Sequence, residues 1–288
     1  MSSKIMLYSG PGANPFCVQA LEDQLKDLSD DRFHRIDHFK EFSALGNAKE
    51  IKAVVIPGGN ANEIYFESDL RKCERVFKNT LDQHRISYYG ACAGAILASS
   101  SLQYGVQNSD HGFCPLDNPF LGLFPGKVIA PLFPKSSGDK ISLTDFNMLN
   151  IDQSQEAFDK PIAVAHVLGP AFLNAESVSR TEVLTTYSGL PNLTFGKIEN
   201  NTYIPSRYIR PSEISESIYH ERDSGASMLL TSSHPEFNSK IVRSEGFRQG
   251  LGITKDQQEK VATKIEVDDI VRGILMKKNF EKIRIRCK

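Results

Sequence analysis

One short stretch, residues Ile86 to Ser99, constrains the fold of this chain most strongly. It begins with an apolar, aromatic run over 86–89 that predicts a buried strand, and it ends with an alanine-rich run that predicts a helix. Between them stands Gly90-Ala-Cys-Ala-Gly94, a turn in which only small residues flank a cysteine. A strand-to-helix turn this tight presents its central side chain at the carboxyl end of the strand. The sequence therefore predicts an α/β fold with Cys92 at the tip of such a turn.

The position of Cys92 at the start of the predicted helix favours its thiolate form. The N-terminal end of a helix carries partial positive charge and N–H groups without partners, and both stabilise an anion. The stretch by itself also fits a second interpretation, in which Cys92 is a buried structural cysteine in a tight turn. A second motif, far along the chain, is needed to choose between the two.

The first hundred residues predict a doubly wound, mostly parallel sheet of the flavodoxin-like type. Apolar runs of strand length alternate with segments whose apolar residues recur at helical spacing. Such alternation gives a parallel sheet with helices on both faces. The chain has 288 residues and is 40% hydrophobic, which is enough for one large domain with a substantial core. The predicted strands are 4–9, 33–39, 53–56 and 86–89, and the predicted helices are 16–28 and 69–84.

Three segments rich in small residues follow predicted strands. They are the loop Gly10–Pro15, the turn Pro57–Asn60 and the turn that carries Cys92. Sites in doubly wound sheets lie at the carboxyl ends of the strands. We therefore expect the three segments to converge on one cleft.

The later part of the chain predicts additions to this core. Residues of about 102–160 are rich in Pro, Gly, Asn, Asp and Ser, and predict a loop-rich insertion over the cleft. Short apolar runs over 162–204 predict antiparallel strands, and 228–231 predicts a central strand. Residues of about 240–288 predict a helical C-terminal extension. We expect all of them to belong to a single domain, 1–288.

A second motif, Ser232-Ser-His-Pro-Glu-Phe237, follows the predicted central strand. In an extended segment, residues i and i+2 share a face, and Pro235 biases His234 toward the extended form. Glu236 can then orient the His234 ring, and His234 can exchange a proton with Cys92. A thiolate activated by an oriented base is the arrangement of a Cys-His-acid nucleophile. The sequence therefore predicts a catalytic site at Cys92, His234 and Glu236, although a lone histidine here would more simply be a core residue.

The end of the 53–56 strand supplies the remaining part of the predicted site. In Pro57-Gly-Gly-Asn60 the backbone N–H groups are open, because glycine has no side chain to cover them. The N–H of Gly59 or Asn60, together with that of Ala93, can bind the oxyanion of a tetrahedral intermediate. We therefore predict that Gly58, Gly59, Asn60 and Ala93 bind the oxyanion and the substrate.

Charge and composition argue against several other classes of function. The formal net charge is −1, so we expect neither a nucleic-acid partner nor a membrane surface. The first residues lack the apolar run of a signal peptide, and no stretch has the length of a membrane span, so we expect a cytoplasmic protein. Five cysteines at irregular spacings, without a C-x-x-C pair, predict neither disulfides nor a metal site. No motif predicts a cofactor.

Three motifs together resemble the class I glutamine amidotransferase superfamily: PGG at 57–59, GACAG at 90–94 and SHPE at 233–236. More narrowly, the chain is similar to the amidotransferase-like N-terminal domain of eukaryotic-type biotin–protein ligases, from about residue 4 to about residue 240. The resemblance implies that Cys92 is the nucleophile, His234 the base and Glu236 the group that orients the base. The narrower similarity is carried by YSGPGANP at 8–15, IPGG at 56–59, YGACAG at 89–94, FPG at 124–126 and EVLTTY at 182–187.

One position departs from the pattern. Working glutaminases of this superfamily usually read GxCxGxQ, and this chain has Ile96 where the glutamine stands. An alkyl group in place of a polar contact weakens discrimination in favour of glutamine.

Three functions therefore remain open. The first is hydrolysis or transfer of an amide or acyl group through a cysteine thioester, with a small amide such as glutamine as substrate. The second is a non-catalytic regulatory or binding module. The third is a small-substrate hydrolase or peptidase of the same superfamily. Since the sequence resembles no ligase or synthetase module, we expect any acceptor or ligase to be a separate protein.

Overall fold

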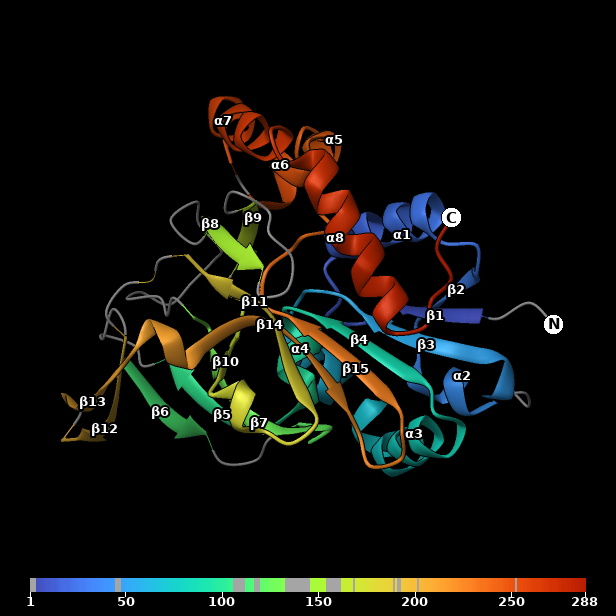
Figure 1. Cartoon of the computed structure of the whole chain (residues 1–288), viewed down its shortest axis with the longest axis horizontal. Coiled ribbons are helices and arrows are strands. Elements are labelled where there is room, and N and C mark those ends of the chain that lie inside the picture. Colours follow the sequence, from blue (N-terminus) through green and yellow to red (C-terminus); the bar gives the residue numbers. More distant parts are fainter. Residues whose placement is uncertain are drawn as a thin grey trace.

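The computed structural model describes residues 4–44, 48–105, 112–116, 120–132, 146–153, 162–167, 169–188, 190, 193–200, 202–251 and 253–288. The strands of these residues form one long sheet, and helices cover both of its faces near the N-terminal strands (Figure 1). The doubly wound α/β fold expected from the sequence is therefore confirmed.

Five parallel strands form the part of the sheet that carries the candidate site. Adjacent strands in this part pair in parallel, and β15 comes from far along the chain to lie beside β4. Parallel strands covered on both faces are apolar throughout, and the last four residues of β3 are all buried. The predicted strands match to within three residues at each end. In order across the sheet they are β2 (Arg32–Ile36), β1 (Lys4–Tyr8), β3 (Ile51–Ile56), β4 (Ser87–Ala91) and β15 (Ser227–Thr231).

Alternate residues of these strands point into two separate apolar clusters, one on each face of the sheet. On one face α1 (Pro15–Leu28) and α8 (Asp269–Lys282) pack against Leu7 and Val55. On the other face lie α2 (Phe39–Ala44), α3 (Leu70–His84) and α4 (Ala93–Ala98), which share a cluster with Tyr8 and Val54. The two layers of helices therefore fix the sheet between them and leave the strand ends free.

Beyond β15 the sheet continues with strands in both directions. Residues of about 102–160, expected to be loop-rich, contribute four strands in the ranges that the structure describes. Proline and glycine inside these strands, such as Pro115 and the Pro125-Gly126 pair, interrupt the alternation on which strand prediction depends. The strands are β5 (Ser99–Gly105), β6 (Gly112–Leu116), β7 (Phe124–Ala130) and β8 (Phe146–Gln153).

The predicted antiparallel strands between 162 and 204 are confirmed, and two further strands join them. The short β10 (Ala171–Leu173) and the long β14 (Ile214–Glu221) were not expected from the sequence, yet β14 lies next to β15 and joins the two parts of the sheet. The predicted strands appear as β9 (Ile162–Val167), β11 (Thr181–Tyr187), β12 (Leu193–Glu199) and β13 (Thr202–Ile209).

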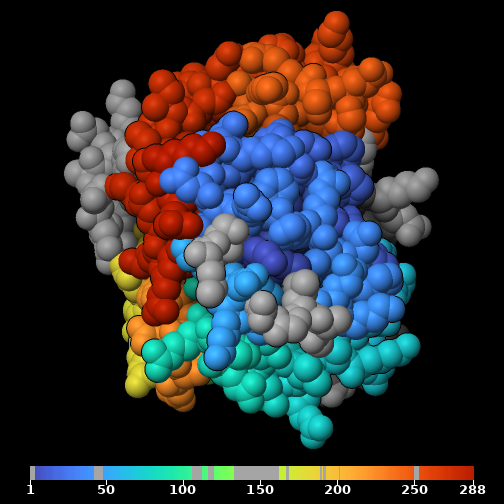
Figure 2. Space-filling view, turned by 90° about the vertical axis from the view of Figure 1, so that its right-hand side faces the viewer, coloured from blue at the N-terminus to red at the C-terminus, as the bar shows by residue number. Residues whose placement is uncertain are grey.

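The C-terminal residues are helical, as expected. This helical extension is interrupted between α7 and α8 at Asp268, whose carboxylate accepts a hydrogen bond from the Ala163 N–H of β9 at 2.9 Å. The last residues return to the N-terminal part of the chain, where the Asp31 carboxylate accepts from the Arg286 N–H at 2.9 Å (Figure 2). None of the helices in the described ranges is long and apolar enough to cross a membrane. Before α8 the helices are α5 (Ser239–Val242), α6 (Glu245–Leu251) and α7 (Lys255–Glu266).

Candidate active site

A cavity of about 430 Å³ lies beyond the carboxyl ends of β1, β3, β4 and β15. The three segments expected to converge all contribute to its wall, through Gly12–Asn14, Gly59–Asn60 and Cys92. An isolated β-bridge between Ala13 and Gly59 holds the first two segments together. The convergence predicted from the sequence is therefore confirmed. The other lining residues are Phe16, Cys17, Glu63, Ile96, His234, Phe237 and Phe247.

Cys92 occupies a strained turn between β4 and α4. Its backbone has φ 49° and ψ −104°, a conformation that side-chain-bearing residues rarely adopt. Close approach makes the flanking glycines necessary, since a Cβ on Gly94 would lie 2.3 Å from the Ile56 carbonyl oxygen. The Cys92 N–H donates to the Thr231 carbonyl at 2.9 Å, which ties the turn to β15. The expected strand–turn–helix geometry around this cysteine is present.

His234 and Glu236 form a buried pair. The Nδ1 atom of His234 lies 2.8 Å from Oε1 of Glu236, and both side chains are almost fully buried. The ring of Phe237 stacks on the imidazole with centroids 4.6 Å apart and planes 7° from parallel. The backbone N–H of His234 donates to the Ala165 carbonyl of β9 at 2.8 Å. The imidazole is thus fixed by its neighbours in position and in the direction of Nδ1.

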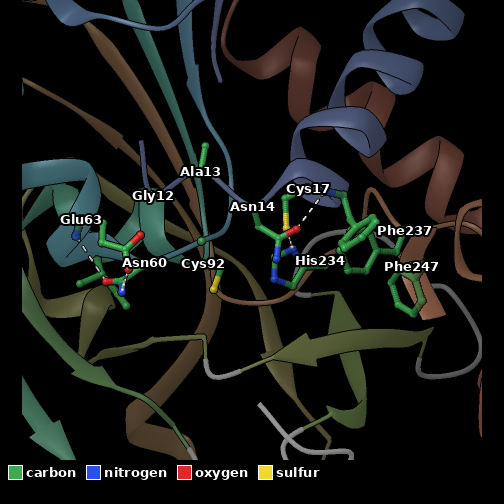
Figure 3. A pocket seen from close by; sticks show the side chains of 13 residues that line it. Gly12, Ala13, Asn14, Cys17, Asn60, Glu63, Cys92, His234, Phe237 and Phe247 are labelled. Carbon is green, nitrogen blue, oxygen red and sulfur yellow. Dashed lines mark hydrogen bonds between the residues drawn. The ribbon is translucent and has the colours of Figure 1, made fainter. Parts of the chain in front are cut away.

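The Cys92 side chain lines the same cavity as this imidazole and is one of the groups that favour its charged form. Figure 3 shows the two side chains at the centre of the cavity. Burial alone lowers the pKa of His234, but Cys17, Glu236 and Cys92 outweigh it and raise the pKa well above 6.5. A histidine that holds its proton beside a cysteine is the electrostatic condition for a thiolate–imidazolium pair.

The four residues predicted to bind the oxyanion differ in their surroundings. The Asn60 N–H donates to the Gly12 carbonyl at 2.8 Å, so this amide, expected to be open, is already occupied by the Ala13–Gly59 bridge. Gly58 packs against the His234 ring, where an added Cβ would lie 2.4 Å from Cε1. Gly59 lines the cavity, and Ala93 is the first residue of α4. Gly59 and Ala93 therefore remain the candidate N–H donors.

Cys17 is a site residue that was not predicted. It lies in the first turn of α1, is 4% exposed, and its sulfur is 3.8 Å from Nδ1 of His234. Asn14 starts α1 by accepting a hydrogen bond from the Phe16 N–H at 2.9 Å, and this cap sets the direction of the first turn. The available signal was position alone, since Cys17 begins the helix that follows the first strand. Burial raises the pKa of the Cys17 thiol above its usual value.

A buried carboxylate supports the segment that carries His234. Glu216 of β14 is 1% exposed and accepts hydrogen bonds from the Ser233 N–H at 2.9 Å and from the Thr231 hydroxyl at 2.8 Å. The hydroxyls of Ser233 and Thr185 bond to the same carboxylate. Several donors on one buried carboxylate make a rigid support. The turn between β15 and His234 is therefore held by Glu216 of β14 as well as by the Ala165 carbonyl of β9.

The cavity has a polar end and an aromatic end. Asn60 and Glu63 lie at one end, joined by a 2.7 Å hydrogen bond, whereas Phe237 and Phe247 lie beyond His234 at the other (Figure 3). Ile96 also lines the cavity, so the departure noted in the sequence bears directly on its wall.

The fold is the glutamine amidotransferase-like α/β fold. A glutamine amidotransferase from Thermotoga maritima superposes with a TM-score of 0.59 at 12% identity, covering 98% of each chain. One from Methylobacillus flagellatus gives 0.51 at 10% identity, covering 100% of this chain and 96% of the other. A further glutamine amidotransferase gives 0.51 at 14% identity, covering 86% of this chain and 99% of the other. At these identities the similarity shows the fold.

The chain belongs to the family described as Biotin-protein ligase, N terminal, whose sequence profile matches residues 3–288. The match includes the helical C-terminal residues, so the expected limit of the resemblance at about residue 240 was too short. No curated protein matches the chain significantly.

Proposed function

We propose that this protein cleaves or transfers an amide or related acyl group through a thioester on Cys92. His234 acts as the base, and Glu236 orients it. The observation that carries the proposal is the buried His234–Glu236 pair beside a cysteine held in a strained strand-to-helix turn. A structural cysteine needs neither an oriented base nor a strained backbone.

The chemistry follows the order of contacts. The Cys92 sulfur attacks the carbonyl carbon of the substrate, and the carbonyl oxygen becomes an oxyanion. The N–H groups of Gly59 and Ala93 donate to this oxyanion. His234 then gives its proton to the leaving nitrogen, the C–N bond breaks, and a thioester remains on Cys92. Water, or an acceptor, attacks the thioester carbon and passes its proton to His234. The C–S bond then breaks, the acyl product leaves, and the Cys92 sulfur and the protonated His234 are restored.

The two ends of the cavity suggest the substrate. A small primary amide fits a space of about 430 Å³, and the Glu63 carboxylate offers an acceptor for an ammonium or amide group of the substrate. Glutamine is a candidate, and ammonia would be its product.

A second function, a non-catalytic binding or regulatory module, is favoured by one observation. Ile96 presents an alkyl group to the cavity where glutaminases usually carry a polar amide. A module that kept the cysteine and its base but lost its substrate contacts would look the same. Hydrolysis of another small amide or peptide is the remaining alternative.

One experiment separates these functions. The rate of iodoacetamide alkylation is measured at each cysteine by mass spectrometry, in parallel with ammonia release from glutamine and a panel of other primary amides. We expect fast alkylation of Cys92 relative to Cys287, with a loss of at least about 100-fold in His234→Ala, since a positioned base contributes about 10²–10⁴. Turnover should vanish in Cys92→Ala and persist in Cys287→Ser.

The outcomes assign the function. If glutamine is turned over, Ile96→Gln should raise its kcat/KM relative to that of other amides. Turnover of other amides alone supports the small-substrate hydrolase. If Cys92 is alkylated no faster than Cys287, and His234→Ala changes nothing, the catalytic proposal is wrong and the binding module takes its place.

A further inference from the structure

A cluster of three ligand-type side chains, two of which line the cavity, lies around Nδ1 of His234. Cys17, His234 and Glu236 each offer one ligand atom, and these atoms lie within 4.8 Å of one another. All three residues are buried, and no ion is present. The three come from the first turn of α1 and from the segment after β15, so the fold rather than the local sequence brings them together.

The carboxylate of Glu236 has bonding capacity left over. Its Oε1 atom meets Nδ1 of His234, but Oε2 is buried without a hydrogen-bond partner among the described residues. A buried carboxylate oxygen without a partner costs free energy, and a catalytic orienting group needs only Oε1. The second oxygen therefore points to a cationic ligand that the catalytic proposal does not supply.

We propose that Cys17, His234 and Glu236 form a site for a thiophilic divalent cation of the zinc class. Thiolate, imidazole and carboxylate are the three ligand types that Zn²⁺ takes in proteins. Around one tetrahedral ion these ligand atoms stand about 3.3–3.6 Å apart, as follows from bond lengths of about 2.0–2.3 Å. The Cys17 sulfur is 3.8 Å from Nδ1, and Nδ1 is 2.8 Å from Oε1. Nδ1 and Oε1 must therefore move apart by about half an ångström, and the Cys17 sulfur must move closer, to complete the site.

The ion has a way in. Cys17 and His234 both line the cavity, so two of the three ligands can be reached from it. The cavity also leaves room for a fourth ligand such as water. Binding releases the proton of the Cys17 thiol and the proton on Nδ1, so affinity rises with pH.

Occupancy of this site would switch off the base. A metal on Nδ1 leaves the ring proton on the other nitrogen, so His234 can no longer take the proton of Cys92. This consequence rests on the proposed function, whereas metal binding itself does not. The site is therefore a regulatory one, in which zinc holds the protein inactive and a chelator releases it.

Cobalt is the spectroscopic probe for the test. The full chain is titrated with Co²⁺, and a thiolate-to-cobalt charge-transfer band in the near ultraviolet reports bonding to sulfur. Zn²⁺ is then added to displace the cobalt. Three matched variants are compared, namely Cys17→Ser, Cys92→Ser and Cys73→Ser, the last removing a thiol on α3.

We expect one equivalent of Co²⁺ and a charge-transfer band in the wild type, Cys92→Ser and Cys73→Ser. Cys17→Ser should lose the band and bind at least about 100-fold more weakly, because removing a second-shell partner already costs 10–100-fold. The absence of binding, or a band that disappears in Cys92→Ser and survives in Cys17→Ser, overturns the proposal. If Cys17→Ser does not fold, wild-type protein alkylated at Cys92 must still give the band.

Alkylation of Cys92 distinguishes the two proposals. Zn²⁺ should slow it at least tenfold in the wild type, with full recovery on addition of a chelator, and should have no effect in Cys17→Ser. A charge-transfer band without any change in alkylation would support the metal site and contradict the role of His234 as base.

Discussion

Gly58 lies so close to His234 that a Cβ at this position would come within 2.4 Å of the ring atom Cε1. The imidazole cannot move aside easily, because Phe237 stacks on it and Glu236 holds Nδ1. The glycine predicted to bind substrate therefore sets the position of the candidate base. The contact also explains why the residue at position 58, just after the end of β3 and next to this histidine, is a glycine.

Replacing Gly58 by alanine tests this contact. We expect Gly58→Ala to slow alkylation of Cys92 at least tenfold and to lower the free energy of unfolding by about 1–3 kcal/mol, the usual cost of overpacking. Gly273→Ala is the matched control, since an added Cβ there meets nothing within 4 Å. In the interior of α8 this change should stabilise the protein by about 0.5–1 kcal/mol. Equal rates for Gly58→Ala and the wild type would contradict the contact.

The pH dependence of stability reports the electrostatics of His234. Its pKa is raised in the folded protein above 6.5. A raised folded pKa means that the folded state binds the proton more tightly, so the stabilisation is complete below about pH 6.5 and is lost as pH rises through the folded pKa. Each unit of the pKa difference corresponds to about 1.4 kcal/mol.

Denaturant unfolding of wild type and His234→Gln at several pH values measures this effect. The difference in free energy of unfolding between the two should shrink as the pH is raised above about 6.5. Glu236 is present in both proteins, so its own titration partly cancels in the comparison. A difference that stays constant or grows with pH would show that His234 is neutral in the folded protein.

Cys92 carries backbone strain that glycine would relieve. At φ 49° and ψ −104° a side chain costs about 1–3 kcal/mol, and glycine adopts such conformations without that cost. We expect the free energy of unfolding of Cys92→Gly to be about 1 kcal/mol higher than that of Cys92→Ala. The greater flexibility of glycine in the unfolded chain opposes this gain but does not cancel it. Thermal and denaturant unfolding of the two variants give this comparison directly. Should the alanine variant be the more stable, the turn is relaxed rather than strained.

Local pattern sufficed for the parts of the site that depend on neighbours in sequence. The small residues around Cys92 and the two-residue spacing of His234 and Glu236 need no distant partner to be recognised. Cys17 could not be found this way, because it is 217 residues away from His234 in the sequence. Their contact depends on the direction of α1, which Asn14 and the Ala13–Gly59 bridge set.

The limits of fold prediction have a similar cause. The buried parallel strands can be recognised in the sequence as apolar runs, as in Ile51–Ile56. β14 alternates less clearly, since its buried positions include Ser215, Glu216 and Ser217, and Glu216 supports the segment before His234 rather than the apolar core. In β6 and β7, proline and glycine obscure strands whose register is set by distant neighbours.

Arg272 connects the helical C-terminal residues to the site. It is 2% exposed and donates to the Ala163 carbonyl of β9 at 2.7 Å, and the neighbouring Ala165 carbonyl accepts from the backbone of His234. We expect Arg272→Leu to lower the free energy of unfolding by about 3–5 kcal/mol, because Asp269 and buried carbonyls lose their partner. Arg75→Leu, at an exposed position of α3, should change it by less than about 0.5 kcal/mol.

The rate of Cys92 alkylation gives a second comparison between Arg272→Leu and Arg75→Leu. Since β9 supports His234, slower alkylation of Cys92 should accompany the instability of Arg272→Leu even under conditions where the variant remains folded. Unchanged stability in Arg272→Leu would mean that the C-terminal helices are not needed to hold β9.

The central position of β15 has a consequence for biosynthesis. β15 pairs with β14 on one side and with β4 on the other, and it belongs to residues 227–231. As the chain emerges from the ribosome, more than a hundred residues are synthesised between β4 and its partner β15. Until β15 is in place, one edge of β4 is exposed and can pair with other chains. Closure of the sheet and delivery of His234 to Cys92 are the same late event. In a nascent chain Cys92 and His234 stay apart until the last central strand is in place, and a block just before that strand leaves an aggregation-prone fragment.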